Sequence, residues 1–286
     1  MIKIYRSSVF YLSLILISIY SCASLRKVDM QVPTDIGSKT QITELSKKDN
    51  VEEKELMVAH HMLSSEQALE EQALSKAKKA SKKNKIDKEV VTKIIKNPFK
   101  VGEQITLDLY YIGIRAARLT IDTLPPVTVD HKKAFHFRGT AETSSLMRYI
   151  YRVYDVIDEY VDYTDIVPLQ MTLKMDETRQ NVSMALIYDH KKAKTTYWKK
   201  RIDAKGEVTE IKREDTLIPY AQDVFSSLYF VRTHDLKVGD KLKFVLHDNG
   251  KNWNMTIDVV KKENIWTRLG TVETFLLIPS VERDGE

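Results

Sequence analysis

The sequence of 286 residues contains one cysteine, nine glycines and three tryptophans. A single cysteine excludes an internal disulfide framework. The sequence also lacks the short signatures of common enzymes, with no G-x-S-x-G elbow, no H-E-x-x-H pair and no glycine-rich phosphate loop. The formal net charge of +5 is too small to indicate a nucleic-acid partner. We therefore expect no enzyme, no metal site and no cofactor.

One apolar segment stands near the N-terminus, Val9–Leu25 (VFYLSLILISIYSCASL). Lys3 and Arg6 precede it, and small residues around Cys22 follow the apolar run. A spanning helix needs roughly 20 mainly apolar residues, and the unbroken run here is shorter. This layout predicts a secretory signal peptide, with an uncleaved N-terminal anchor as the alternative.

The tetrapeptide Ile19-Tyr20-Ser21-Cys22 resembles the lipobox of bacterial lipoproteins, although Tyr20 replaces the small or aliphatic residue usual at its position. The resemblance implies that residues 1–21 are removed and that the Cys22 thiol carries a lipid with fatty acyl chains such as palmitate. Ala23, rather than an acid, follows the cysteine, which by resemblance favours the outer membrane and a periplasm-facing domain. Anchoring in the inner membrane is the alternative.

Two polar segments follow the predicted signal. Residues 22–50 scatter Pro, Gly, Ser and Thr without periodicity, which predicts a flexible linker. Residues 51–96 lack Pro and Gly, and glutamates come early while lysines come late, which favours a helical stalk. The stalk is either a solvated spacer or a surface for anionic headgroups or a partner protein. His60-His61 have no further ligand nearby, so we interpret them as surface residues.

From Phe99 onward the apolar period changes from helical to alternating, which predicts strands at Ile105–Ile112 and Ala117–Ile121. Pro125-Pro126 are predicted to end the second strand. Lys241–His247 and Trp253–Val260 flank Asp248-Asn249-Gly250, a favoured tight turn, and predict a hairpin. A second predicted hairpin pairs residues 195–202 with residues 208–212.

Between these hairpins lies one predicted helix, Asp223–Arg232 (DVFSSLYFVR). Asp223 is a plausible N-cap, and Val224, Leu228 and Val231 are expected to form the buried face. The predicted fold class is mainly β, a curved antiparallel sheet like a half-barrel with one short helix over residues 97–286.

Four stretches occur in an order that resembles the bacterial exported family called domain of unknown function 3108: FKVGEQITLDLYYIGIRAARLTI, YRVYDVIDEYVDYTDIVPLQMTL, QDVFSSLYFVRTHDLKVGDKLKFVLHDNGKNWNMTIDVV and GTVETFLLIPSV. The resemblance spans residues 98–286. It implies secretion, often as a lipoprotein, and a barrel-like antiparallel sheet, and it brings no established activity. It also implies a further hairpin after LLIPSV, so we expect the sequence to be truncated at its C-terminus.

Two regions are candidates for a ligand site. In Arg148–Tyr163, tyrosines alternate with charges, and Tyr149, Tyr151, Arg152 and Tyr154 could contact a sugar or lipid headgroup. In Gln222–Arg232, the residues that could border a site are Asp223, Tyr229 and Arg232. The alternative for both regions is packing, capping and ion pairing. Asp155 and Asp158 could be imagined as a catalytic acid and base, but their spacing puts them on opposite faces of a strand. His234 and His247 lie by predicted turns, where we expect solvated rings.

We expect a non-catalytic envelope lipoprotein whose β domain binds an amphipathic or glycan ligand or an envelope partner. Two alternatives are a structural module that uses the 51–96 helix for docking and, third, a glycan-modifying enzyme.

Overall fold

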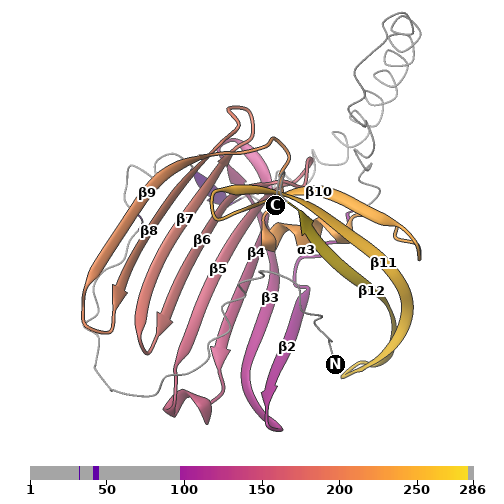
Figure 1. Cartoon of the computed structure of the whole chain (residues 1–286), viewed down its shortest axis with the longest axis horizontal. Coiled ribbons are helices and arrows are strands. Elements are labelled where there is room, and N and C mark those ends of the chain that lie inside the picture. The colour runs from indigo at the N-terminus through magenta and orange to yellow at the C-terminus, as the bar shows by residue number, and fades with distance from the viewer. Residues whose placement is uncertain (1–31, 33–40, 45–96, 283–286) are drawn as a thin grey trace, which may run out of the picture.

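The computed structural model describes Val32, residues 41–44 and residues 97–282 (Figure 1). The predicted signal peptide with Cys22, most of the linker 22–50 and the stalk 51–96 lie outside the described residues. The chain is mainly β, with a curved antiparallel sheet that forms a half-barrel and one α-helix in the described part. The predicted fold class is confirmed.

Two antiparallel sheets and a helix make up the described structure. The large sheet has the order β1-β3-β4-β5-β6-β7-β8-β9, with β2 also paired to β3, and the small sheet has the order β10-β11-β12. The elements are β1 (Ile42–Glu44), β2 (Gln104–Tyr111), β3 (Ile114–Val129), β4 (Lys132–Thr143), the 3-10 turn η2 (Met147–Tyr149), β5 (Val153–Asp162), β6 (Pro168–Glu177), β7 (Gln180–Asp189), β8 (Lys194–Asp203), β9 (Val208–Thr216), α3 (Val224–Arg232), β10 (Lys241–Asp248), β11 (Lys251–Thr267) and β12 (Gly270–Glu282).

Strand β1 lies inside the segment that we predicted as a flexible linker. Ile42 pairs with Val129 and Glu44 pairs with Val127, so β1 and β2 occupy different stretches of the same edge of β3. The prediction of an unstructured linker is wrong for these three residues. A β-branched pair, Ile42-Thr43, favours the extended backbone that this edge accepts.

Both predicted hairpins are confirmed. β10 and β11 are joined by Asn249-Gly250, whose φ angles of 48° and 75° are those of the tight turn that suits twisted strands. β8 pairs with β9 in the second hairpin. β11 continues past its predicted end to Thr267, where it pairs with β12.

Pro125 and Pro126 lie inside β3, so the predicted break is wrong. The register with β4 jumps from Leu124 opposite His136 to Val127 opposite Ala134, which places the prolines in a bulge. On the other edge, β2 pairs only as far as Asp122 and β1 begins at Val127. The prolines therefore stand where neither neighbouring strand needs an N–H donor.

Helix α3 begins as predicted at Asp223, whose Oδ1 accepts a hydrogen bond from the Ser226 amide at 2.7 Å. The predicted buried face is wrong at Val224 and Leu228, which are 41% and 55% exposed. The prediction is confirmed at Val231, and the other buried residues of the helix are Ser226 and Tyr229. A helix packed between two sheets needs two apolar faces. The prediction assumed a single apolar stripe along the helix and therefore placed Val224 and Leu228 wrongly on the buried face.

Helix α3 separates the two sheets (Figure 1). The Tyr229 ring stacks on Phe137 of the large sheet with centroids 3.5 Å apart. Phe230 contacts Phe244 of the small sheet with centroids 5.2 Å apart. Next to the helix, the connection between β9 and α3 pairs with β10, because the Gln222 amide donates to the Val245 carbonyl and the Gln222 carbonyl accepts from the His247 amide.

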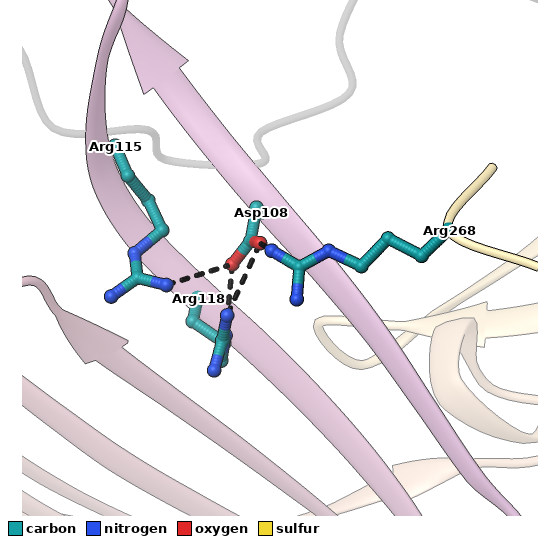
Figure 2. A network of polar contacts seen from close by, with 4 residues as sticks. All are labelled: Asp108, Arg115, Arg118 and Arg268. Atoms are coloured by element: carbon teal, nitrogen blue, oxygen red, sulfur yellow. Dashed lines mark hydrogen bonds and ion pairs between the residues drawn. The ribbon is translucent and has the colours of Figure 1, made fainter. Parts of the chain in front are cut away.

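A second junction lies far from the helix, at the edge strand β2 (Figure 2). Asp108 accepts from Arg118 on β3, with Nε–Oδ1 at 2.8 Å, and from Arg268 in the β11–β12 turn, with Nη2–Oδ2 at 2.8 Å. Arg115 lies at 3.9 Å from the same carboxylate. The hydrogen bond from Arg118 leads the effects that lower the pKa of Asp108. This carboxylate ties the tip of the small sheet to the large one.

Candidate functional site

The face of the large sheet that contacts α3, here called the inner face, follows from strand register. On β5 the inner positions are odd-numbered, because Ile157 lies by Phe225 and Glu159 lies by Asp223. Register then assigns the inner positions of the neighbouring strands. The inner face has two halves, one beneath α3 and one beyond it.

The half beneath α3, the closed half, is built from aromatic rings. Phe99 meets Phe135, Phe137 and Tyr229 edge to face, with centroids 5.1–5.4 Å apart. Gly139 permits this packing, because a Cβ there would lie 2.6 Å from Ile157 Cγ2 and 3.1 Å from the Phe225 ring. These rings leave no room for a ligand at their centre, since Phe137 is fully buried.

The half beyond α3, the open floor, has apolar side chains that the helix reaches only at one margin, where Ile157 lies by Phe225 and Leu119 packs against the closed half. Two cross-strand rows run through it, one through Leu107, Leu119, Ala141 and Met175, and the other through Ile157, Leu173 and Met184. Leu107 is 55% exposed, and the other six are half-buried. Contiguous part-exposed apolar side chains indicate a surface that is covered when a ligand or partner binds.

Asp155 stands in the middle of the first row, between Ala141 on β4 and Met175 on β6. Burial raises the pKa of this carboxyl to about 7, and the neighbouring Glu177 adds to the rise. Its Oδ1 has no hydrogen-bond partner among the described residues. Near neutral pH the carboxyl is therefore divided between a neutral form, which suits an apolar surface, and a charged form, which does not.

Glu177 lies beside Asp155 at the end of β6 and is 4% exposed. Its Oε2 accepts hydrogen bonds from the Tyr151 hydroxyl at 3.0 Å and from Gln180 Nε2 at 2.8 Å. Burial, followed by the Glu177 charge, raises the pKa of Tyr151 to about 12, so the phenol remains a donor. This network fixes a negative charge at one border of the open floor.

The opposite border, on β8, is basic. Lys199 pairs with Met184 and Arg201 pairs with Val182 in the β7–β8 register, so both share the inner face. Arg201 is exposed and Lys199 is half-buried. The floor is therefore apolar along its length, with cations at the β8 border.

A second acidic pair lies in the closed half. Glu159 is fully buried beneath the N-terminus of α3, and burial, with the nearby Asp223 charge, raises its pKa well above the ordinary value of 4.5. Asp223 Oδ2 accepts from the Tyr188 hydroxyl at 2.9 Å, while Oδ1 caps the helix. Glu159 is thus neutral, and this pair is sealed from solvent.

The predicted site residues near β5 are divided between two faces. Tyr151 lies with Glu177 on the inner side, whereas Arg152 pairs with Asp176 on the outer side. Tyr149 is 92% exposed on η2, and Tyr154 is 50% exposed at an outer position of β5. Of these four, only Tyr151 borders the open floor.

The predicted site residues on α3 have structural partners. Asp223 caps the helix, and Tyr229 is 2% exposed within the closed half. Arg232 pairs with Glu103 at 2.5 Å, as expected for a cation at a helix end. The structure does not bring these three side chains together with Tyr149, Arg152 and Tyr154.

Asp155 and Asp158 lie on opposite faces of β5, as the spacing predicts. Asp158 accepts from Arg138 Nε and contacts His136 Nε2, each at 2.7 Å, on the outer face. These two contacts counter the effect of burial and lower the pKa of Asp158. The acid that lies beside Asp155 on the inner face of the open floor is Glu177.

The expectation of solvated rings for two histidines is wrong, since His234 is 7% exposed and His247 is 2% exposed. His247 Nδ1 contacts Asn252 Oδ1 at 3.1 Å, and His234 Nδ1 contacts the Phe230 carbonyl oxygen at 2.9 Å. Both turns pack against α3 or β7, which local sequence does not reveal. Within the described residues, no three His, Cys, Asp or Glu side chains gather as metal ligands.

Sequence reasoning missed the open floor, although β6 carries a signal for it. Met171, Leu173 and Met175 alternate with Thr172, Lys174 and Asp176, which indicates a strand with one apolar face. That pattern does not say whether the face is covered. The answer depends on the length and position of α3.

A family model described as "Protein of unknown function (DUF3108)" matches residues 106–286. The chain belongs to this family. The match takes in most of β2 and every later strand described, so the family shares the sheet and α3. No curated protein and no solved structure matches the chain. Among the described helices, none is long and apolar enough to cross a bilayer.

Proposed function

We propose that this chain is a non-catalytic lipoprotein of the bacterial cell envelope that binds an amphipathic ligand on the open floor. The observation that carries the proposal is the set of part-exposed apolar side chains on adjacent strands, most of which lie beyond the reach of α3. A ligand that covers about 300 Å² of apolar surface gains on the order of 7 kcal/mol before the costs of association. Micromolar binding requires a net gain of about 8 kcal/mol, so the charged headgroup or a larger covered area must contribute as well.

The β8 border of the floor favours the headgroup of an anionic amphiphile, at a distance from the acidic border at Glu177. Lys199 and Arg201 lie at the β8 border, where an acidic headgroup would find opposite charge. The apolar tail would lie across Met184, Leu173 and Ile157 toward β2. Methionine side chains adapt to irregular shapes, so Met175 and Met184 suit a flexible acyl chain.

Binding fits this geometry better than catalysis does. The Glu159–Asp223 pair is sealed under α3, with the two residues 0% and 5% exposed, so a substrate cannot reach it without movement of the helix. Asp155 and Asp158 lie on opposite faces of β5 and cannot act on one bond.

The proposed location rests on residues outside the described part. Cys22, after the lipobox-like residues, would carry the acyl groups, and residues 23–41 would connect the lipid to the sheet. The outer membrane, with the domain in the periplasm, is the proposed site, and Ala23 is the residue that supports it over the inner membrane.

The proposal is tested on the full chain purified from the membrane fraction. Mass spectrometry should find an acylated Cys22 and a co-purifying amphiphile. Titration with a dansyl-labelled fatty acid should show saturable binding, which Met175→Glu should weaken by about tenfold or more because it places a charge in the apolar row. The matched control is Lys174→Glu, one residue away on the outer face, which should change the affinity by less than about twofold. Equal effects of the two variants, or binding without saturation, would contradict the proposal.

A further inference from the structure

Three connections meet at one end of the large sheet. The β2–β3 turn and the β4–β5 connection are neighbours, because the Ser144 amide donates to the Ala116 carbonyl. The β11–β12 turn joins them through the bond from Arg268 to Asp108 on β2 (Figure 2). Figure 1 shows the β2–β3 and β11–β12 tips and the η2 segment at the same end of the strands, opposite the β3–β4 turn.

This end, here called the apolar rim, exposes large apolar side chains from all three connections. Each connection carries an aromatic residue and at least one aliphatic residue, with exposures from 43% to 94%. The side chains are Tyr110, Tyr111, Ile112 and Ile114 from β2–β3, Leu146, Tyr149 and Ile150 from β4–β5, and Ile265, Trp266 and Leu269 from β11–β12. An apolar patch of this kind, built from separate tips, indicates an interaction surface.

The opposite end of the same strands is polar. Its exposed turn residues are Asp130 and His131, Thr164 and Asp165, and Lys191 and Lys192. The connection from β9 to α3 adds only Ile218 and Tyr220 as exposed large apolar side chains there, against ten at the apolar rim. The contrast shows that exposed apolar tips are not a general property of this sheet.

Ile112 at the tip of β2–β3 is strained as well as exposed. It has φ 47°, a left-handed conformation that β-branched residues rarely adopt, and it is 82% exposed. The equivalent turn positions elsewhere hold Asp130 at φ 49° and Asn249 at φ 48°, residue types that tolerate this region. An isoleucine here costs about 1–2 kcal/mol and gives no packing in return, so its presence requires another cause.

The three connections of the apolar rim contain basic residues and no acid, and the acids that pair with them, Asp108 for Arg115 and Arg268 and Asp176 for Arg152, lie on the adjacent strands. Residues 110–116, 144–152 and 264–270 contain Arg115, Arg148, Arg152 and Arg268 and no acid. Arg115, Arg148 and Arg268 are exposed. The Asp108 carboxylate, which lies behind the tips, has a side chain only 10% exposed and holds Arg268 in place. Tyrosine and tryptophan with arginine are the residues that suit the boundary between acyl chains and anionic headgroups.

We propose that the apolar rim docks on the surface of a bilayer that contains anionic lipid. The tips of β2–β3, η2 and β11–β12 enter the headgroup region, and the arginines contact lipid phosphates. A bilayer suits three projecting tips because it deforms around each, whereas a rigid protein surface would need a pocket for each. Each basic residue near an anionic surface contributes on the order of 1 kcal/mol. The proposal uses none of the open-floor residues and does not depend on the proposed ligand.

Trp266, which is 82% exposed, provides the test. The full chain is placed on vesicles of phosphatidylethanolamine and phosphatidylglycerol whose acyl chains carry bromine, which quenches tryptophan at contact. We expect the Trp266 emission to be quenched and blue-shifted, and we expect Trp266→Phe to remove both changes. The other two tryptophans should report nothing in either protein, because Trp198 is 1% exposed and Trp253 is half-buried at the other end of β11, packed against the core of the small sheet.

Two further measurements decide between occupants. In Trp266→Phe combined with Tyr220→Trp, the reporter moves to the polar end and should not be quenched. In phosphatidylcholine vesicles, quenching of Trp266 should fall by about threefold or more, because the arginines lose their partners. Equal quenching at both ends would overturn the assignment of the apolar rim, and equal quenching in neutral vesicles would overturn the role of anionic lipid. A change in Trp266 emission with protein concentration alone would identify a second copy as the occupant and overturn the proposal.

Discussion

Asp155 and Glu159 lie on the same face of β5. They differ in that α3 covers Glu159 and does not cover Asp155. Glu159, beneath α3, is fully buried, and its pKa is raised well above the ordinary range. Asp155, four residues away in the open floor, is half-buried, and its pKa is raised to about 7. Of two carboxyl groups on the same strand, the one in the closed half is thus held neutral, and the one in the open floor can titrate near neutral pH.

The two halves also differ in their side chains. The closed half uses rings in fixed edge-to-face and stacked contacts, such as Tyr229 on Phe137. The open floor uses aliphatic side chains and two methionines, Met175 and Met184, which adapt to irregular shapes. The comparison shows that α3 divides the inner face into a buried part that stabilises the fold and a part whose apolar side chains remain partly exposed.

The largest expected effect comes from the closed half. Tyr229→Ala removes a ring that contacts Phe99, Phe137 and Phe225, and it should lower the free energy of unfolding by about 3–5 kcal/mol. Met184→Ala in the open floor removes a half-buried side chain and should cost about 1–2 kcal/mol. Urea denaturation of the full chain measures both. Equal costs would mean that the two halves do not differ in packing, and Tyr229→Phe, which keeps the ring, serves as the control.

The next effect concerns Glu159. The native state keeps a proton on this carboxyl that the unfolded chain releases above about pH 4.5, so the contribution of Glu159 to stability falls as pH rises through and beyond that value. Glu159→Gln should remove this loss and raise the free energy of unfolding at pH 8 by about 1–3 kcal/mol. Denaturation curves at pH 5 and pH 8 check the prediction. A variant that is less stable than the parent at both pH values would show that Glu159 is ionised in the native state.

The third prediction concerns the charge of Asp155 and its effect on the affinity of the open floor for a ligand. Its carboxyl gains charge as pH rises through about 7, so an anionic fatty-acid probe should bind about three- to tenfold more weakly at pH 8 than at pH 6. Asp155→Asn should make the affinity independent of pH over this interval. Glu177→Gln should shift the transition to lower pH, because the Glu177 charge raises the pKa of Asp155. A pH dependence that survives Asp155→Asn would assign it to another group.

Strand pattern and turn chemistry explain how much of the fold the sequence predicts. Alternation at β2, the Asn249-Gly250 turn and the Asp223 cap each depend on neighbours along the chain, and each was predicted correctly. The prediction that Pro125-Pro126 end the strand was wrong, because whether a strand can contain prolines depends on where its neighbours β1 and β2 stop pairing with it. Tertiary packing likewise decides which side chains of the inner face α3 covers. Exposure of Met175 and burial of Tyr229 therefore could not be read from local pattern.

The site illustrates the same limit. Tyr151 was predicted as a candidate on composition, and its partner Glu177 lies 26 residues away, so no window of sequence joins them. Asp155 was considered with Asp158 because the two are close in sequence, yet the register of β5 with β6 gives Asp155 a different neighbour. Side chains on adjacent strands meet through register, which is set by the whole sheet.

The smallest expected effect concerns the junction of the two sheets at Asp108. Asp108→Asn removes the charge that holds Arg268 and Arg118, so the β11–β12 turn should separate from β2. Overall stability should change little, because asparagine can still accept from the arginines and because ion pairs with a solvent-exposed partner such as Arg268 contribute weakly and are screened by salt. Amide exchange at Thr267–Gly270 should instead rise by about two- to tenfold, since the tip loses its one described ion-pair contact with the large sheet. Arg115→Gln, which removes only the pair at 3.9 Å, should leave the exchange rate unchanged. If both variants behave alike, the β11–β12 tip is held by its own strand pairing and not by Asp108. The relative position of the two sheets would then depend on α3 and on the pairing of Gln222 with β10.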